Sequence, residues 1–384
     1  IESHEGPFVP MPAHDAGEEG PLRMSLVESG GRRHPTAELR RLMGPTWRFA
    51  PGAANGITDV AGVTVGHSTL LDPEQSTCTG VTVVQPCPGV VHHPVPAAVH
   101  VINGYGKSVG LMQIEELGEL ESPIALTGVF GIPDVLRALV DHLLVEDPDL
   151  GSEKSGRSVN AVVMECNDSR MHDPRVTQPG AAELAEAIRG AGAGPVPQGP
   201  VGAGVGMSTF GFAGGIGTAS RVVPLDGSAY HVGALVLTNF GRRDDLVIAG
   251  RPVGQLLPQP VPVGSLGGSV IVILATDLPT GSAQLKRLAR RAQNGLARTG
   301  CSTSGSSGEV VLAFSTARGA DLAREPLDWA FAAVAESVEE AVLNSLCHSV
   351  QVRGRAGRSR EPFPADRLPE LLRAAGPAVV GSER

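Results

Sequence analysis

A serine follows two glycines at the start of a strongly apolar run in this sequence. Residues 266–277 read LGGSVIVILATD, so that Gly267 and Gly268 precede Ser269 and then seven apolar or small residues. A run of this kind, without alternation, is typical of a strand buried on both faces. Taken alone, Gly-Gly-Ser at this place is an ordinary tight turn that enters a strand.

The same arrangement suits cleavage of the backbone by its own serine. A serine hydroxyl can attack the carbonyl carbon of the residue before it, which converts the amide into an ester that water opens. Glycine at that position keeps the carbonyl accessible and permits an unusual backbone conformation. The product chain would begin with Ser269, whose free α-amine can act as a base, as in enzymes with an N-terminal threonine.

A second segment favours this functional interpretation over the turn. Residues 299–317 read TGCSTSGSSGEVVLAFSTA, and hydroxyls and glycines accumulate just before another apolar run. Within it, Ser307 and Glu309 are two residues apart and would lie on the same side of an extended chain. A carboxylate at a strand entrance can orient a hydroxyl that relays protons to a nucleophile.

Strands and helices are mixed along the chain that must position these residues. Apolar runs predict strands over 158–166, 231–241, 269–276 and 309–315, and helical periodicity predicts helices over 181–190, 282–297, 328–348 and 366–375. Residues 191–223 are rich in glycine and predict no regular element, and residues 1–45 show no periodicity. Several strands buried on both faces predict stacked layers in which helices cover sheets.

Composition narrows the classes of partner and cofactor. The chain has 384 residues, 41% of them hydrophobic and 18% charged, and a net charge of −9 without a long basic run, so nucleic acid is not expected as a partner. No apolar run reaches the length of a membrane span. The five cysteines are scattered and form no C-x-x-C pair. They predict reduced thiols in a cytoplasmic protein, with no metal site and no disulfide framework.

The sequence resembles peptidase family S58, the self-processing N-terminal-nucleophile aminopeptidases that include the L-aminopeptidase/D-esterases and the β-peptidyl aminopeptidases. The resemblance extends from about residue 56 to about residue 346. It rests on the ordered blocks ITDVAGVTVGHSTL, GFAGGIGTASRVV, LTNFGRRDDL, GSVIVILATD, LARRAQNGLARTG and SGEVVLAFSTA. It implies an α/β fold, a layered α-β-β-α sandwich of two packed sheets flanked by helices, in a homo-oligomer, often a tetramer, without cofactor or metal.

The resemblance also implies a role for each matching residue. Cleavage between Gly268 and Ser269 would divide a single catalytic domain (46–384), which follows a flexible arm (1–45), into an α part (46–268) and a β part (269–384). Ser269 would be the nucleophile of both processing and catalysis. Ser307 and Glu309 would assist proton transfer, and Asn239 would help to hold the oxyanion.

The substrate-facing positions partly depart from the family pattern. Glu165 aligns with a carboxylate that anchors the free amine of the substrate. Asn167 and Arg170 stand where an aromatic ring is usual, Gly128 where asparagine is common, and Lys107 where glutamate is frequent. We therefore expect an altered pocket around Glu165, Asn167 and Gly128, in which Arg170 or Lys107 favours an anionic group.

These residues predict a serine hydrolase that removes N-terminal residues from small peptides, amides or esters through an acyl-enzyme on Ser269. Two alternatives stay open at the level of sequence. One is an acyltransferase on the same scaffold, in which an amine replaces water. The other is a processed binding protein without catalytic activity.

Overall fold

The computed structural model describes residues 35–43, 46–258, 268–319 and 321–376. These residues belong to one compact unit that begins at Pro35. The predicted arm therefore lies largely outside the described residues, as does most of the proline-rich segment before Gly268.

Two β-sheets form the centre of this unit. The strands of the smaller sheet are, in spatial order, β1 (Thr64–Asp72), β2 (Thr77–Gln85), β5 (Ile124–Gly128) and β6 (Val162–Cys166). The strands of the larger sheet are, in spatial order, β4 (Glu119–Leu120), β3 (Val95–Gly104), β12 (Gly308–Ser315), β11 (Ser269–Thr276), β10 (Ser228–Asn239) and β9 (Gly215–Leu225).

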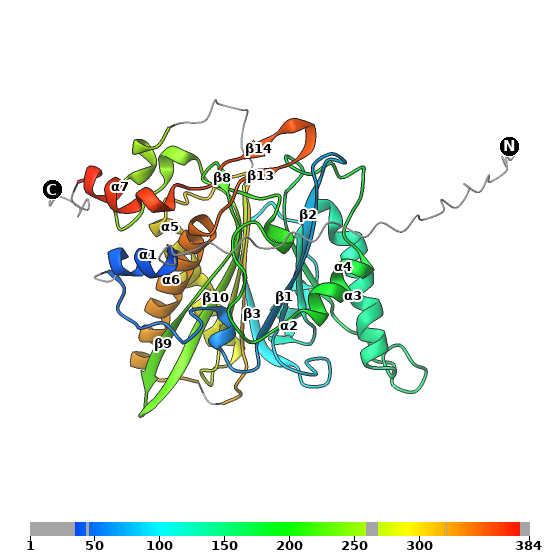
Figure 1. Cartoon of the computed structure of the whole chain (residues 1–384). Coiled ribbons are helices and arrows are strands. Elements are labelled where there is room, and N and C mark those ends of the chain that lie inside the picture. Colours follow the sequence, from blue (N-terminus) through cyan, green and yellow to red (C-terminus); the bar gives the residue numbers. More distant parts are fainter. Residues whose placement is uncertain (1–34, 44–45, 259–267, 320, 377–384) are drawn as a thin grey trace, which may run out of the picture. The chain divides into compact units, whose positions relative to one another are not determined.

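Helices cover the outer face of each sheet, as Figure 1 shows. Helices α5 (Ser282–Arg298) and α6 (Arg324–Cys347) pack on the larger sheet, and α3 (Ile132–Glu146) and α4 (Ala181–Arg189) pack on the smaller one. The predicted α-β-β-α sandwich is thus confirmed. The shorter elements are α1 (Pro35–Met43), α2 (Leu111–Leu117), α7 (Leu368–Ala374), β7 (Ser208–Thr209), β8 (Phe212–Ala213), β13 (Val352–Arg353) and β14 (Ser359–Arg360).

Strand β11 shows why the sequence folds into layers. All eight of its residues are buried. Val270, Val272 and Leu274 belong to the core beneath α5 and α6, whereas alternate residues such as Ile271 and Ile273 belong to the core between the two sheets. Side chains alternate across a strand, so a run with no polar residue must find apolar partners on both faces.

Two segments differ from the sequence-based expectation. Helix α1 lies within residues 1–45, and its Leu39 and Met43 are fully buried. Strand β9 (Gly215–Leu225) begins within the glycine-rich residues 191–223 and pairs along its length with β10. Its glycines serve close packing, because a Cβ on Gly217 would lie 1.9 Å from the Ala341 carbonyl oxygen of α6.

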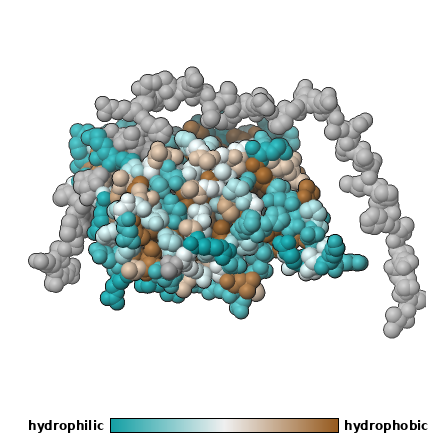
Figure 2. Space-filling model, turned by 90° about the horizontal axis from the view of Figure 1, so that it is seen from below, coloured by the Kyte–Doolittle hydropathy of each residue, from teal (hydrophilic) through white to brown (hydrophobic). Residues whose placement is uncertain are grey.

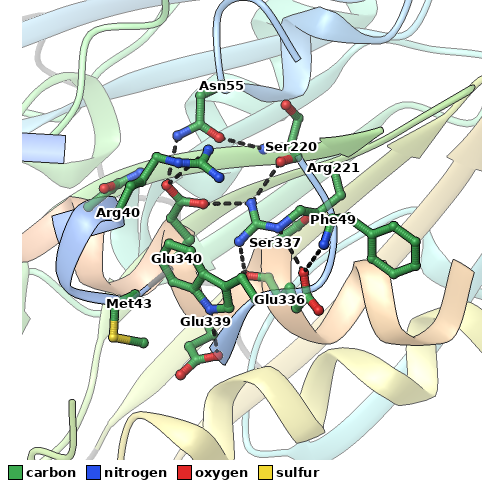
Figure 3. A network of polar contacts seen from close by, with 12 residues as sticks. Arg40, Met43, Phe49, Asn55, Ser220, Arg221, Glu336, Ser337, Glu339 and Glu340 are labelled. Carbon is green, nitrogen blue, oxygen red and sulfur yellow. Dashed lines mark hydrogen bonds and ion pairs between the residues drawn. The ribbon is translucent and has the colours of Figure 1, made fainter. Parts of the chain in front are cut away.

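A buried ionic network joins α6 to β9, as Figure 3 shows. Arg221 is fully buried, and its guanidinium donates to the carboxylates of Glu336 and Glu340. The indole of Trp47 stacks against Arg221 and donates to Glu339. The network ties the segment that follows α1 to the helical layer.

The surface has mixed polarity on the side drawn in Figure 2, where hydrophobic side chains are scattered between hydrophilic ones. Several large apolar side chains are nevertheless exposed near α2, with Met112 87% exposed and Leu117 61% exposed. Within the described part of the chain, no helix has both the length and the apolar character that crossing a membrane requires.

Candidate active site

Sheet register brings three distant segments to one edge of the larger sheet. Ser269, the first residue of β11, is opposite Asn239 of the antiparallel strand β10 and opposite Gly308 of the parallel strand β12. The end of an antiparallel neighbour and the start of a parallel neighbour must meet the start of β11. The serine, the amide of Asn239 and the Ser307–Glu309 segment therefore converge, as the sequence predicts.

The hydroxyl of Ser269 receives two hydrogen bonds. The Asn167 backbone N–H donates to Ser269 Oγ at 3.3 Å, and Asn239 Nδ2 donates to the same oxygen at 3.2 Å. The Ser208 N–H donates to Asn239 Oδ1 at 3.0 Å, which fixes the direction of the amide and turns its nitrogen toward Ser269. Asn239 thus presents an N–H donor next to the candidate nucleophile.

The peptide group between Gly268 and Ser269 is held by the neighbouring strand. The Gly308 N–H donates to the Gly268 carbonyl oxygen at 3.2 Å. Ser307 lies beside this group, because a Cβ placed on Gly268 would be 3.1 Å from Ser307 Oγ. Ser307 is 1% exposed, and its hydroxyl has no hydrogen-bond partner among the described residues. A free buried hydroxyl at this place can exchange protons with a reacting group.

Glu309 is buried behind Ser307 and is oriented by a residue that the sequence analysis did not single out. Thr303 Oγ1 donates to Glu309 Oε2 at 2.7 Å, and Thr303 has a φ of +52°. The Cys301 thiol lies 3.9 Å from Glu309 Oε1. Burial, with the charge of Glu309, raises the pKa of Cys301 to about 12, so this cysteine is no competing nucleophile at neutral pH.

Glu165 lies on β6, close to the start of β12. Its carboxylate accepts a hydrogen bond from the Lys107 N–H at 2.8 Å. A Cβ on Gly106 would be 3.5 Å from Glu165 Oε1 and 3.8 Å from the Cα of Gly308. Burial raises the pKa of Glu165, and the bond from Lys107 opposes that shift. A partner with a positive charge would stabilise the ionised form.

Gly128 lies beside a second buried carboxyl group, that of Asp168. It does not line the cavity next to the Gly268–Ser269 peptide. A Cβ on Gly128 would be 2.2 Å from Asp168 Oδ2. Burial raises the pKa of Asp168 to about 7, against the lowering effect of the Thr79 hydroxyl. Asp168 Oδ2 has no hydrogen-bond partner in the described structure. The sequence analysis missed Asp168, although an acidic residue just after a buried strand is a usable signal.

A cavity of about 330 Å³ opens next to the Gly268–Ser269 peptide. Its wall includes five residues that the sequence analysis singles out: Asn167, Asn239, Gly268, Ser307 and Glu309. Ser269 and Glu165 are not among the lining residues. The wall also carries three arginines, Arg170, Arg242 and Arg360. Arg242 forms an exposed ion pair with Asp244.

No group of three or more His, Cys, Asp and Glu side chains that could hold a metal ion occurs among the described residues. The groups near Ser269 are hydroxyls, amides, carboxylates and backbone N–H groups. Two donors contact the Ser269 oxygen. The buried Ser307 hydroxyl lies next to the preceding peptide, and the Glu309 carboxylate lines the same cavity as Ser307. These parts suit acyl transfer through a serine.

Comparison with known proteins decides the family. The model of peptidase family S58 matches residues 55–360. The chain belongs to peptidase family S58. A member named β-peptidyl aminopeptidase BapA, from Sphingosinicella xenopeptidilytica, is 34% identical, and the match covers 93% of this chain and 96% of that protein. Family membership makes this chain a hydrolase of the peptidase class.

Solved structures of the S58 family have the same fold. A β-aminopeptidase from a Burkholderia species superimposes with a TM-score of 0.79 at 38% identity, covering 89% of this chain and 99% of that chain. The L-aminopeptidase D-Ala-esterase/amidase of Ochrobactrum anthropi gives a TM-score of 0.78 at 36% identity, covering 86% and 97%. That enzyme is described as a variant of the Ntn-hydrolase fold, which is the fold class that the sequence predicts.

Proposed function

We propose that this S58 peptidase cleaves its own chain before Ser269 and then acts as an aminopeptidase with Ser269 as nucleophile. The observation that carries the proposal is the convergence at one sheet edge. Ser269 Oγ faces the Asn239 amide, and Ser307 Oγ lies beside Gly268, the residue before the peptide bond to be cleaved. Cleavage would separate an α part ending at Gly268 from a β part of residues 269–384.

In the processing step, Ser269 Oγ attacks the Gly268 carbonyl carbon. The Gly308 N–H already donates to the oxygen on which negative charge develops, and such a donor stabilises the tetrahedral intermediate. The bond from that carbon to the Ser269 nitrogen breaks, and the hydroxyl proton passes to this nitrogen, with Ser307 in position to relay it. Water then hydrolyses the ester, which leaves a Gly268 carboxylate and a free Ser269 amine.

Turnover repeats this chemistry on an external substrate. The free α-amine of Ser269 accepts the hydroxyl proton as Oγ attacks the substrate carbonyl. Asn239 Nδ2 donates to the oxyanion, a contribution of about 3 kcal/mol to the transition state. Ser307 and Glu309, the latter held by Thr303, pass the proton to the departing amine. Water hydrolyses the resulting acyl ester.

The substrates are small peptides, amides or esters with a free amino end. The relatives are named for β-peptidyl aminopeptidase and for L-aminopeptidase and D-Ala-esterase activity, which supports this class. Glu165 would anchor the substrate amine, since its buried carboxylate gains from a positive partner. Asn167 would contact the substrate from the cavity wall, and Gly128 would shape the site indirectly, by leaving room for Asp168.

We also propose a cytoplasmic homo-oligomer, a tetramer by analogy with the family. All five cysteines are free, which suits a reducing compartment. Met112 and Leu117 on α2, with Tyr105 before it, expose apolar surface that a second copy could cover. Light scattering of the purified protein tests the subunit number.

The test of the function compares wild-type protein with Ser269→Ala on a panel of aminoacyl p-nitroanilides, amides and esters. We expect hydrolysis by the wild type and a loss of at least about 10³-fold in the variant. The matched control, Ser265→Ala, removes a nearby serine of the same glycine-rich segment and should keep full activity. Equal activity of wild type and Ser269→Ala would refute the proposal. Product formed only when an amine is added would instead indicate acyl transfer.

A further inference from the structure

Arg360 lies in the wall of the active-site cavity but comes from a distant part of the chain. It is the last residue of β14, which forms a short hairpin with β13. The cavity that Arg360 lines also contains Asn239, Gly268 and Ser307. A ligand positioned by these groups is therefore within the same enclosure as the Arg360 guanidinium.

The Arg360 side chain has no counter-charge within the described structure. Its Nε is buried without a hydrogen-bond partner, and no described carboxylate forms an ion pair with it. Burial lowers the pKa of Arg360 to about 10, and the charges of Arg170, Arg243 and Arg358 lower it further. The side chain stays protonated at neutral pH, in surroundings that disfavour its charge.

The other charged groups of this cavity are already engaged. Arg242 pairs with Asp244. The wall contains two carboxylates. The charge of Asp245 favours the protonated form of Arg242, and Glu309 accepts a hydrogen bond from the Thr303 hydroxyl. Neither is among the charges that act on Arg360. An anion that enters the cavity could therefore accept hydrogen bonds from the Arg360 guanidinium.

We propose that Arg360 binds the C-terminal carboxylate of a dipeptide, so that the preferred substrates are dipeptides with a free carboxyl end. The inference rests on the proposed aminopeptidase function. A carboxylate accepts paired N–H bonds from a guanidinium, and in a dipeptide it lies one residue beyond the bond to be cut. A cavity of about 330 Å³ is of the size that holds such a small ligand. The positive charge of Arg170 in the same wall adds to the attraction.

The test measures kcat/KM for alanyl-alanine and for alanyl-alanine amide with wild-type protein and with Arg360→Met. The wild type should prefer the free acid by about tenfold or more, the effect of one charge-assisted hydrogen-bonded contact. The ratio should fall to about one in Arg360→Met. The matched control is Arg353→Met, which removes an exposed arginine of the same hairpin and should leave the ratio within about twofold.

Each other outcome has a defined meaning. An unchanged ratio in Arg360→Met, or a wild type that does not discriminate acid from amide, overturns the inference while the proposed function stands. A preference found only for aspartyl over alanyl p-nitroanilide, and lost in Arg360→Met, places the bound carboxylate on the N-terminal residue and overturns the dipeptide assignment. If no compound is hydrolysed, the proposed function fails. Calorimetric binding of the same acid and amide to both proteins then decides the role of Arg360, and equal affinities refute it.

Discussion

Two buried polar regions of this molecule are satisfied to very different degrees. Around Arg221, each carboxylate has several donors; Glu336, for example, accepts from Arg221 and from the backbone of Arg48 and Phe49 (Figure 3). Around Ser269, by contrast, Ser307 Oγ, Asp168 Oδ2 and Arg360 Nε have no described partner. Both regions exclude water to a similar extent, since Arg221, Ser307 and Asp168 are each at most 2% exposed.

This difference in hydrogen bonding indicates that the two regions use their buried polar groups differently, for stability around Arg221 and for chemistry around Ser269. A buried group without a partner costs about 1–3 kcal/mol, and a fold accepts that cost where a reaction or a ligand will use the group. All three guanidinium nitrogens of Arg221 donate hydrogen bonds in the resting protein, so Arg221 contributes to stability. The groups near Ser269 keep bonding capacity for a substrate or a migrating proton.

Arg221→Met tests the satisfied region. It would remove the guanidinium that donates to the buried carboxylates of Glu336 and Glu340, and we expect a loss of about 3–5 kcal/mol in the free energy of unfolding. Arg367→Met is the matched control, because Arg367 and its partner Glu370 are both exposed, and the loss of this ion pair should cost at most about 1 kcal/mol. Denaturant midpoints measure both. Similar losses in the two variants would remove the distinction between the regions.

Ser307→Ala tests the unsatisfied region in the opposite sense. Because no described residue forms a hydrogen bond with its hydroxyl, the midpoint of unfolding should change little. The loss of the relay should lower kcat by about 10²-fold or more, measured on an aminoacyl p-nitroanilide. The neighbouring Ser306→Ala, which removes a hydroxyl that bonds to Ser304, should keep its activity. A variant of Ser307 that is destabilised but active would assign this serine a structural role.

Gly128→Ala tests whether the Asp168 carboxyl leaves no room for a side chain at position 128. The new methyl group would contact a carboxyl oxygen at 2.2 Å, and overpacking of this kind costs about 1–3 kcal/mol. The double variant Gly128→Ala with Asp168→Ala should be less destabilised than the sum of the single variants. Additive losses, measured by thermal denaturation, would show that the two positions do not interact.

Asp168 should also make stability depend on pH. Its pKa is raised from 3.8 to about 7 by burial, so between about pH 4 and pH 7 the folded state holds a proton that the unfolded state has lost. The free energy of unfolding should then fall as pH rises, by up to about 1.4 kcal/mol per pH unit. Asp168→Asn removes this titration. The free energy of unfolding of the variant, minus that of the wild type, should therefore increase between about pH 4 and about pH 7. A difference that stays constant from about pH 4 to about pH 7 would contradict the raised pKa of Asp168.

The sequence predicts the layers because the signals of the individual strands and helices are local. The uninterrupted apolar run of β11 and the period of α5 fix their burial without knowledge of their neighbours. Family resemblance adds Asn239, whose place opposite Ser269 depends on sheet register. Strand β9 was missed because its glycines, such as Gly217, are selected by contact with α6 and carry no strand propensity.

The rest of the site depends on contacts that no local pattern encodes. Thr303 reaches Glu309 through a backbone turn with positive φ. Arg360 follows the last matching sequence block and enters the cavity only through the β13–β14 hairpin. The expected role of Gly128 at the substrate stays a prediction, and the structure places this glycine against Asp168. That carboxyl explains why a side chain is absent there.

The central claim is that the chain cuts itself between Gly268 and Ser269. Intact mass spectrometry of purified, folded wild-type protein under denaturing conditions tests it most directly, with Ser269→Ala alongside. We predict two masses for the wild type, one fragment ending at Gly268 and one beginning at Ser269, and a single full-length mass for the variant. A single full-length mass for folded wild-type protein would contradict the account.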